Sequence, residues 1–336
     1  MGMVSSQCGS PTQEEGLDMP SESIWKLGGL SLKDLAVRVW NEATEDEVFG
    51  RAAELAYYFL LALIPLLVFL TSLIGMIVGS GTGLRHRLFD YLAQVMPGSA
   101  FNLIDSTMYE ISRSSSDSKL WLGILGALWV SSSGVGALSG ALNVAFDVKE
   151  TRPWWRQRLT ALILTLALGV LIISALLLVL AGSHLAQVIA QYYKLGSVFT
   201  TAWEILQWPL VLVVILFAFA LIYYFAPDLH KVHWRLITPG SIVGVVLWLL
   251  VSFGFKLYLH FFDSYSRTYG SLGAVIVLML WLYLAGAAIL IGGEVNAVIE
   301  DAMAKAGEPD AKLKGEKAPG EGIEPGNADR SETART

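Results

Sequence analysis

Six long apolar stretches divide the chain, and each is long enough to cross a membrane as a helix. Because a backbone in lipid must satisfy its own hydrogen bonds, it favours continuous helices of roughly 20 apolar residues. The stretches cover approximately residues 55–79, 120–146, 159–182, 206–226, 238–262 and 271–299. We therefore predict an all-α protein that forms an integral membrane bundle of six transmembrane helices.

Capping residues indicate where some of these helices begin. Thr238 and Pro239 open the fifth stretch, as a cap followed by the proline favoured at the first helical position. The segment SLKDLAVRVWNEA, residues 31–43, has apolar residues at helical spacing, with Ser31 and Asp34 as a capping pair. It predicts an amphipathic helix that lies on the membrane surface before the first span.

The segments outside the apolar stretches are of two kinds. The loop after the first stretch contains two amphipathic pieces, separated by Pro97 and Gly98, which we expect to cap the outer end of the bundle. Residues 1–22 and 304–336 have few large apolar side chains, so they cannot bury enough surface to fold. We therefore expect one membrane domain at residues 23–303 between two disordered tails.

The charged residues agree with a membrane location and orient the bundle. They make up 15% of the sequence, compared with about a quarter in a typical soluble domain. Lysines and arginines gather in the loops at 149–158 and 231–235 and in the C-terminal tail, while the opposite side carries fewer of them over a longer loop. Since cytoplasmic loops are enriched in basic residues, we expect both termini in the cytoplasm.

Several classes of function find no support in the sequence. The net charge is −6, with the acidic excess largely in the tails, and no basic stripe would bind nucleic acid. Cys8 is the one cysteine, and we interpret it as an incidental reduced thiol. His230 and His233 stand three apart without a third ligand, so they do not indicate a metal site. With no nucleotide-binding loop or catalytic motif, we predict no enzyme activity, no metal and no cofactor.

Polar residues gather at the expected cytoplasmic ends of the first, second and sixth spans. Ionisable groups inside a membrane are costly and usually face a bundle interior or a wet cavity, each with a partner. We therefore predict a polar vestibule open to the cytoplasm. Its residues would be Glu54, Asn143, Arg152, Glu294 and Asn296, with Arg51 and Asp147 beside them. The alternative is that side chains at span ends reach the headgroups and have no function.

Other residues within the spans allow a structural and a functional interpretation. Lys256 can extend to the outer surface along its long stem, or it can carry a cargo. The serine run 131–133 precedes Gly136 and Gly140, whose four-residue spacing favours close helix packing or, as the alternative, the lining of a permeation path. Pro65 is expected to bend the first helix. We assign packing to the remaining glycines of this group, Gly240, Gly244 and Gly273.

Five segments, in this order, resemble one family of bacterial inner-membrane proteins. They are AAELAYYFLLALIPLL, LWVSSSGVGALSGALNVAFDVKETRPWWRQRL, YYFAPD, ITPGSIVGVVLWLLVSFGFKLYL and YGSLGAVIVLMLWLYLAGAAILIGGEVNA. The sequence is similar to the YihY/BrkB family over about residues 30–300. The resemblance implies a six-helix bundle in the bacterial inner membrane with both termini in the cytoplasm. Many members have a small residue where Glu54 stands, which would restrict a role of Glu54 to a subgroup.

The resemblance implies more about location than about chemistry. Members of the family were long labelled ribonuclease BN, but this sequence lacks the clustered H-x-H-x-D-H ligands of a metal-dependent nuclease. Other members are associated with serum resistance and with movement of lipids or solutes in the envelope. The resemblance thus favours a protein that moves a lipid, an amphiphile or a small solute, and the alternative is a non-transporting envelope scaffold. Membrane lipids, such a cargo and a second copy of the chain are the partners that we expect.

Overall fold

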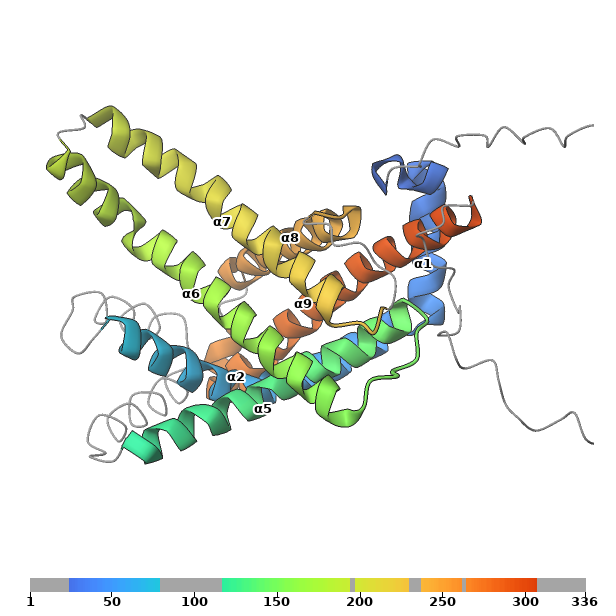
Figure 1. The fold of residues 1–336 in the computed structure, drawn as a ribbon, viewed down its shortest axis with the longest axis horizontal. Coiled ribbons are helices and arrows are strands. Elements are labelled where there is room, and N and C mark those ends of the chain that lie inside the picture. Colours follow the sequence, from blue (N-terminus) through green and yellow to red (C-terminus); the bar gives the residue numbers. More distant parts are fainter. Residues whose placement is uncertain (1–23, 79–116, 194–196, 230–236, 262–263, 307–336) are drawn as a thin grey trace, which may run out of the picture.

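The computed structural model of the chain is built from helices (Figure 1). It describes residues 24–78, 117–193, 197–229, 237–261 and 264–306. No strand occurs in these ranges, which confirms the all-α fold. The elements are the 3₁₀ helix η1 (Ile24–Gly29) and the α-helices α1 (Leu32–Glu45), α2 (Val48–Val78), α5 (Asp117–Ala145), α6 (Trp154–Tyr192), α7 (Ser197–Phe225), α8 (Pro239–Phe261) and α9 (Ser264–Lys305). The predicted external loop, the histidine pair and nearly all of both tails lie outside the described residues.

Five of the described helices are long and apolar enough to cross a membrane. Their apolar segments are Leu125–Ala145, Trp154–Val179, Val198–Phe225, Pro239–Tyr258 and Val275–Lys305. The remaining expected span corresponds to α2, a helix of 31 residues that continues through Pro65.

Several helices extend further than the apolar stretches that predicted them, whereas α8 lies within its stretch. Helix α7 begins at Ser197 instead of near residue 206, so Pro209 lies inside it. The apolar segment of α7 itself begins at Val198, eight residues before the predicted stretch. An internal proline is tolerated in a membrane bundle because neighbouring groups satisfy the freed backbone carbonyl.

Helix α9 is the centre of the bundle. It packs against α8 and α2, and its last turns also contact η1 and α1. On the other side of α2 follow α5, α6 and α7, each in contact with the next. Figure 1 shows α6 and α7 as a long antiparallel pair whose far ends lean away from α2 and α5. The chain order places the start of α2, the end of α5 and the start of α6 at one end of the bundle.

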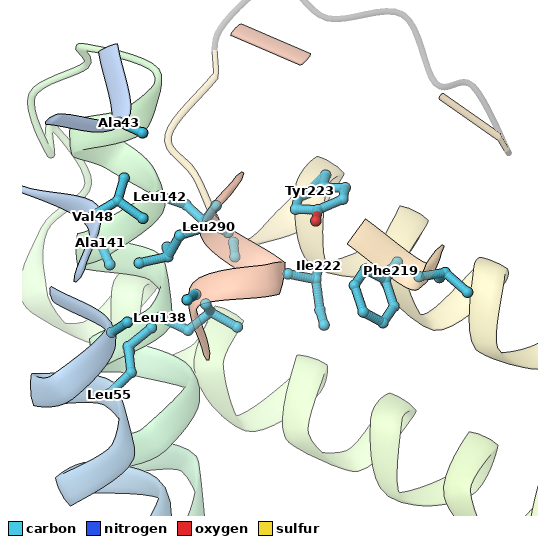
Figure 2. Packing of buried hydrophobic residues seen from close by; sticks show 14 of the residues in the cluster. Ala43, Val48, Leu55, Leu138, Ala141, Leu142, Phe219, Ile222, Tyr223 and Leu290 are labelled. Carbon is cyan, nitrogen blue, oxygen red and sulfur yellow. The ribbon is translucent and has the colours of Figure 1, made fainter. Parts of the chain in front are cut away.

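A buried apolar core joins α2, α5, α7 and α9 at this end. Figure 2 shows its side chains, which include Leu55, Leu138, Leu142, Ile222 and Leu290. In a membrane this core stabilises the bundle through close van der Waals packing, because lipid tails are as apolar as leucine. The core therefore fixes the positions of the helix ends that surround it.

Small residues bring α8 and α9 together beside Tyr223 of α7. A Cβ at Gly244 would lie 2.6 Å from the Tyr223 hydroxyl oxygen, and one at Gly292 would lie 2.7 Å from the Gly240 carbonyl oxygen. Both distances are too short for a real side-chain carbon, so these crossings require glycine. The Tyr223 hydroxyl donates a hydrogen bond to the Ile289 carbonyl oxygen at 2.8 Å, and this bond ties α7 to α9.

On α5 the close contact falls at a different glycine from the expected pair. A Cβ at Gly134 would lie 3.1 Å from the Phe59 ring of α2, whereas nothing lies within 4 Å of one at Gly136 or Gly140. Gly136 and Gly140 follow Gly134 by two and six residues, which corresponds to rotations of about 200° and 240° around the helix axis. Both glycines therefore point away from this contact. Gly273 is buried in α9.

The segment before the first span forms the predicted amphipathic helix, α1. The Ser31 hydroxyl accepts from the Asp34 backbone N–H at 3.1 Å and donates to Asp34 Oδ2 at 2.7 Å, which confirms the capping pair. The buried side chains Leu35 and Val39 pack against the last turns of α9, while Trp40 is exposed. Helix α1 therefore covers the end of α9 with its apolar face.

Candidate functional site

The turn between α5 and α6 is held by an ion pair between Glu150 and Arg152. Arg152 donates from Nε to Glu150 Oε1 at 2.7 Å and from Nη2 to Glu150 Oε2 at 2.8 Å, a two-point geometry that fixes both side chains. Arg152 also donates to the Ala226 carbonyl oxygen after α7 at 3.0 Å. Ser139 of α5 donates to the same carbonyl oxygen and accepts from Arg152 at 3.2 Å. Arg152 therefore ties the ends of α5 and α7 to the start of α6.

Asn143 and Asp228 extend these contacts across the ends of α5 and α7. Asn143 Nδ2 donates to Glu150 Oε2 at 2.9 Å, and its Oδ1 accepts from the Asp228 backbone N–H at 2.7 Å. The Asp228 carboxylate accepts from the backbone N–H and the hydroxyl of Thr151 at 2.8 and 2.6 Å, and it lies 3.6 Å from Arg152 Nε. We call the set Asn143, Glu150, Thr151, Arg152 and Asp228 the loop network.

The charges of the loop network stabilise one another. Burial by itself would raise the pKa of the Glu150 carboxyl, but hydrogen bonds from Arg152 and Asn143 and the positive charge of Arg152 lower that pKa below its ordinary value of 4.5. The hydrogen bond to Glu150 raises the pKa of Arg152 against the effect of burial, and the negative charges of Glu150 and Asp228 add to this. Both side chains are therefore charged at neutral pH.

Asp147 forms the turn that ends α5. Its backbone lies in the left-handed region, with φ of 48°, a conformation that Asp and Asn tolerate better than most residues. The Asp147 N–H donates to the Val144 carbonyl oxygen and the Val148 N–H to the Asn143 carbonyl oxygen, each at 2.8 Å. This is the Schellman arrangement that closes many helices. The side chain of Asp147 is exposed.

Asn296 of α9 supports the start of α8. Its Oδ1 accepts from the Gly240 backbone N–H at 2.9 Å, one of the first N–H groups of a helix, which lack an acceptor within it. Thr238 acts as the predicted cap, because its Oγ1 accepts from the Ser241 N–H at 3.1 Å. The Ser241 hydroxyl accepts in return from the Thr238 N–H at 3.0 Å.

Glu294 and Lys256 occupy opposite environments. Glu294 is 0% exposed. It follows Gly286 and Leu290 at intervals of four residues, and a Cβ at Gly286 would lie 3.5 Å from the Ala52 carbonyl oxygen, so this face of α9 is the one that packs against α2. Lys256 is exposed on α8.

A cavity of about 360 Å³ lies between α2, α5 and α6. Small-molecule pockets have volumes of roughly 300–1,000 Å³, so this one has room for a small polar group. Gly140 lines the cavity, and its lack of a side chain helps to leave the space open. The lining consists of Arg51, Glu54, Leu55 and Tyr58 of α2, Ser133, Ala137, Gly140 and Ala141 of α5, and Arg158 of α6.

Arg158 brings a second guanidinium to this cavity. Its Cζ lies 4.2 Å from the centre of the Trp129 ring, which is a cation–π contact. Its Nη1 donates to Ser133 Oγ at 3.4 Å, and its Nη2 donates to the Trp129 carbonyl oxygen. Its Nε is buried and has no hydrogen-bond acceptor among the described residues. Arg158 is thus held in position by the ring and the backbone carbonyl of Trp129 and by the Ser133 hydroxyl, all on α5.

The structure places the residues of the predicted vestibule in separate surroundings. Asn143 and Arg152 share the loop network, and Glu54 shares the cavity with Arg51. Asn296 supports α8, and Glu294 is buried inside the bundle. Similar depth in a membrane does not bring side chains together, because each helix points its residues around all of its faces.

Three charged residues of these sites were not singled out by the sequence analysis. Glu150 and Asp228 belong to the segments KETRP and FAPD, where a carboxylate stands within three residues of a proline after an apolar stretch. Charged residues at two such turns are a signal for a contact between loops on the same side. Arg158 had a weaker signal, since it stands at the start of a long apolar stretch among other basic residues.

The comparisons with known proteins cover most of the membrane part of the chain. Residues 39–317 match the family described as Virulence factor BrkB. The chain belongs to the BrkB family. This confirms the resemblance drawn from the five sequence segments, and together with the apolar helices it makes this BrkB-family chain an integral membrane protein.

Similar proteins are found in Bacillus and Xanthomonas species. The ribonuclease-like protein YfkH of Bacillus subtilis is 34% identical over 261 residues, which cover 78% of this chain and 93% of that protein. UPF0761 membrane proteins of Xanthomonas oryzae and Xanthomonas campestris are each 28% identical over 260 residues, which cover 76% of this chain. The BrkB-family chain spans 58% of the length of these Xanthomonas proteins. No solved structure matches it.

Proposed function

We propose that this BrkB-family protein moves a lipid, an amphiphile or a small solute across the bacterial inner membrane or between its leaflets. The observation that carries the proposal is the cavity between α2, α5 and α6, where Arg51, Glu54 and Arg158 meet within an apolar bundle. Charged side chains in membrane helices are costly, and they usually mark a path or a site for a polar ligand. The acyl part of an amphiphile would remain in the bilayer while its polar group occupies the cavity.

The basic residues support a cytoplasmic position for the cavity and for both termini. Arg156 and Arg158 stand in the first turns of α6, and Lys149 and Arg152 stand in the turn before it. Basic residues are enriched on the cytoplasmic side of membrane proteins. In our proposal α2, α6 and α8 begin on this side and α5, α7 and α9 end there, so both tails of the chain share the cytoplasm.

Glu54 and Glu294 would contribute to this function in different ways. Glu54 is exposed and lines the cavity, so it can meet a cargo directly. Glu294 is buried on α9, so it would act through the packing of α9 against its neighbours. The sequence carries no ATP-binding loop, and uphill movement would therefore draw on an ion gradient or a partner subunit.

Reconstitution into liposomes, followed by a flux screen of labelled lipids and osmolytes, tests the proposal. We expect wild-type protein to raise the flux of at least one compound above that of protein-free liposomes. Glu54→Gln and Glu294→Gln should change this flux. Glu45→Gln should not, because Glu45 is an exposed residue of α1 outside the cavity. Equal flux with and without protein across the whole screen would contradict the proposal.

A non-transporting envelope scaffold is the second candidate, and the loop network together with Asn296 favours it. Asn143, Arg152 and Asn296 form their hydrogen bonds within the protein, as expected of residues that lock a bundle. For a scaffold, a deletion strain would regain envelope integrity equally well with wild type and with Glu54→Gln. We propose no enzymatic role, and cleavage of RNA by the purified protein that depends on His230 or His233 would overturn this assignment.

A further inference from the structure

We propose that Arg51 and Arg158 bind the phosphate of an anionic membrane lipid in the cavity between α2, α5 and α6. The inference deepens the proposed function, because it names the chemical class of the cargo. The claim that the lipid is moved rests on the proposed function. The claim that the lipid is bound does not, because binding can be measured by itself.

The charges of the cavity lining are the first reason. Two guanidiniums and one carboxylate line the cavity, which leaves one positive charge in excess. Among the described residues, no carboxylate forms an ion pair with Arg51 or Arg158 within 4.0 Å. Charges removed from water are costly unless they are paired. A phosphodiester with one negative charge would bring the sum to zero.

The available hydrogen-bond donors are the second reason. The Arg51 Nε donates to the Asp46 carbonyl oxygen at 3.0 Å, and its two terminal nitrogens make no hydrogen bond to the described residues. Arg158 adds a second positive charge, and its Nη1 donates only a long hydrogen bond of 3.4 Å to Ser133 Oγ, which a phosphate oxygen can replace. A guanidinium presents its donors in a planar fork that fits the oxygens of a phosphate group. The hydroxyl groups of Tyr58 and Ser133 line the same cavity and can add further donors.

The apolar surroundings favour a lipid over a soluble phosphate. One helical turn deeper than Tyr58, Leu61 of α2 is 53% exposed. One turn deeper than Ser133, Trp129 of α5 is 46% exposed. Leu61 and Trp129 are thus exposed apolar side chains one turn away from lining residues of α2 and α5, where the acyl chains of a lipid bound in the cavity would contact them. A soluble anion would gain nothing from such contacts.

A lipid titration of the purified full chain tests the site. The chain is held in neutral detergent micelles, short-chain phosphatidylglycerol is added, and the bound fraction is read by native mass spectrometry. Phosphatidylcholine with the same acyl chains serves as the lipid without net charge, and glycerol 3-phosphate as the soluble phosphate. We expect phosphatidylglycerol to bind more tightly than either.

Substitutions assign this binding to the cavity. Arg51→Gln and Arg158→Gln should each weaken phosphatidylglycerol binding about tenfold, the usual effect of losing a hydrogen bond to a charged group. Glu54→Gln should strengthen binding, because it removes the negative charge of the lining. Arg156→Gln is the matched control: Arg156 also lies near the start of α6 but does not line the cavity, so binding should be unchanged.

Folding and binding can be separated. Arg158 contacts Trp129, so Arg158→Gln could lower the yield of folded protein. Arg158→Lys keeps the charge without the planar fork and should bind between wild type and Arg158→Gln. Folded Arg51→Gln that binds phosphatidylglycerol as wild type does would overturn the proposal. Equal binding of phosphatidylcholine or of glycerol 3-phosphate would overturn the assignment to an anionic lipid.

The two proposals fail in distinguishable ways. Binding that depends on Arg51 and Arg158, without any flux in liposomes, would refute the transport function and leave the lipid site standing. Flux that is unchanged in both arginine variants would refute the lipid site and leave transport standing.

Discussion

Replacement of Arg152 by glutamine removes the centre of the loop network. The change deletes two hydrogen bonds to Glu150, one to the Ala226 carbonyl oxygen and one to the Ser139 hydroxyl, and it removes the cation that lies 3.6 Å from the Asp228 carboxylate. The Arg152 and Glu150 side chains are only 17% and 24% exposed. Removing one partner of a fully buried ion pair lowers the free energy of unfolding by about 3–5 kcal/mol. Because these two side chains keep some contact with water, we expect a smaller loss of about 2–3 kcal/mol.

This loss can be measured by titrating the protein with SDS in mixed micelles and following tryptophan fluorescence. Arg156→Gln is the control, because Arg156 is exposed and lies only over the Trp155 ring, and it should cost about 0.5 kcal/mol or less. The double variant Arg152→Gln, Glu150→Gln should lose less than the sum of the two single losses, since the two side chains act as a pair. If Arg152→Gln unfolds at the same SDS fraction as Arg156→Gln, the loop network does not hold the helix ends.

Three further changes test other parts of the structure with the same unfolding measurement. The pKa of Glu150 is lowered in the folded protein, so the charged carboxylate contributes to stability above the ordinary value of 4.5. This contribution is lost as the pH falls through the folded-state pKa. Wild type should therefore lose stability more steeply below pH 4.5 than Glu150→Gln. Gly244→Ala should cost about 1–3 kcal/mol, because its Cβ would meet the Tyr223 hydroxyl, whereas Gly136→Ala, with open space at its Cβ, should be tolerated. Asn296→Ala should cost about 1–2 kcal/mol by leaving the buried Gly240 N–H without its acceptor, and equal stability of this variant and wild type would argue against the support of α8 by α9.

Most of the fold could be predicted from the sequence, because lipid imposes a simple rule on the backbone. Long apolar stretches must be helical in a membrane, and the caps at Ser31 and Thr238 follow from local hydrogen bonding. The start of α7 could not be predicted in this way, although its end at Phe225 was. Its helix begins at Ser197, and the part before Pro209 packs against α6, where a Cβ at Gly182 would lie 3.2 Å from Trp203 Nε1.

The candidate site could be predicted only in part. The sequence indicates which residues lie at the same end of the bundle, but the rotation of each helix decides which of them meet. Glu54 and Arg51 lie three residues apart on one helix, so their common position in the cavity follows from helical periodicity. The pairing of Arg152 with Asp228 and the position of Arg158 opposite α2 depend on the packing of separate helices, which the charged turns and the basic start of α6 signal only weakly.

The central claim is that the cavity between α2, α5 and α6 can be reached by water from the cytoplasm, and cysteine labelling tests it most directly. In a Cys8→Ser background, cysteine is placed at Ser133, which lines the cavity, or at Ser132, its fully buried neighbour outside the lining. A membrane-impermeant maleimide is then applied to inverted membrane vesicles and to intact spheroplasts. We expect Ser133→Cys to react in inverted vesicles and not in spheroplasts, and Ser132→Cys to react in neither. Equal protection of the two positions in inverted vesicles, or reaction of Ser133→Cys only in spheroplasts, would contradict the account.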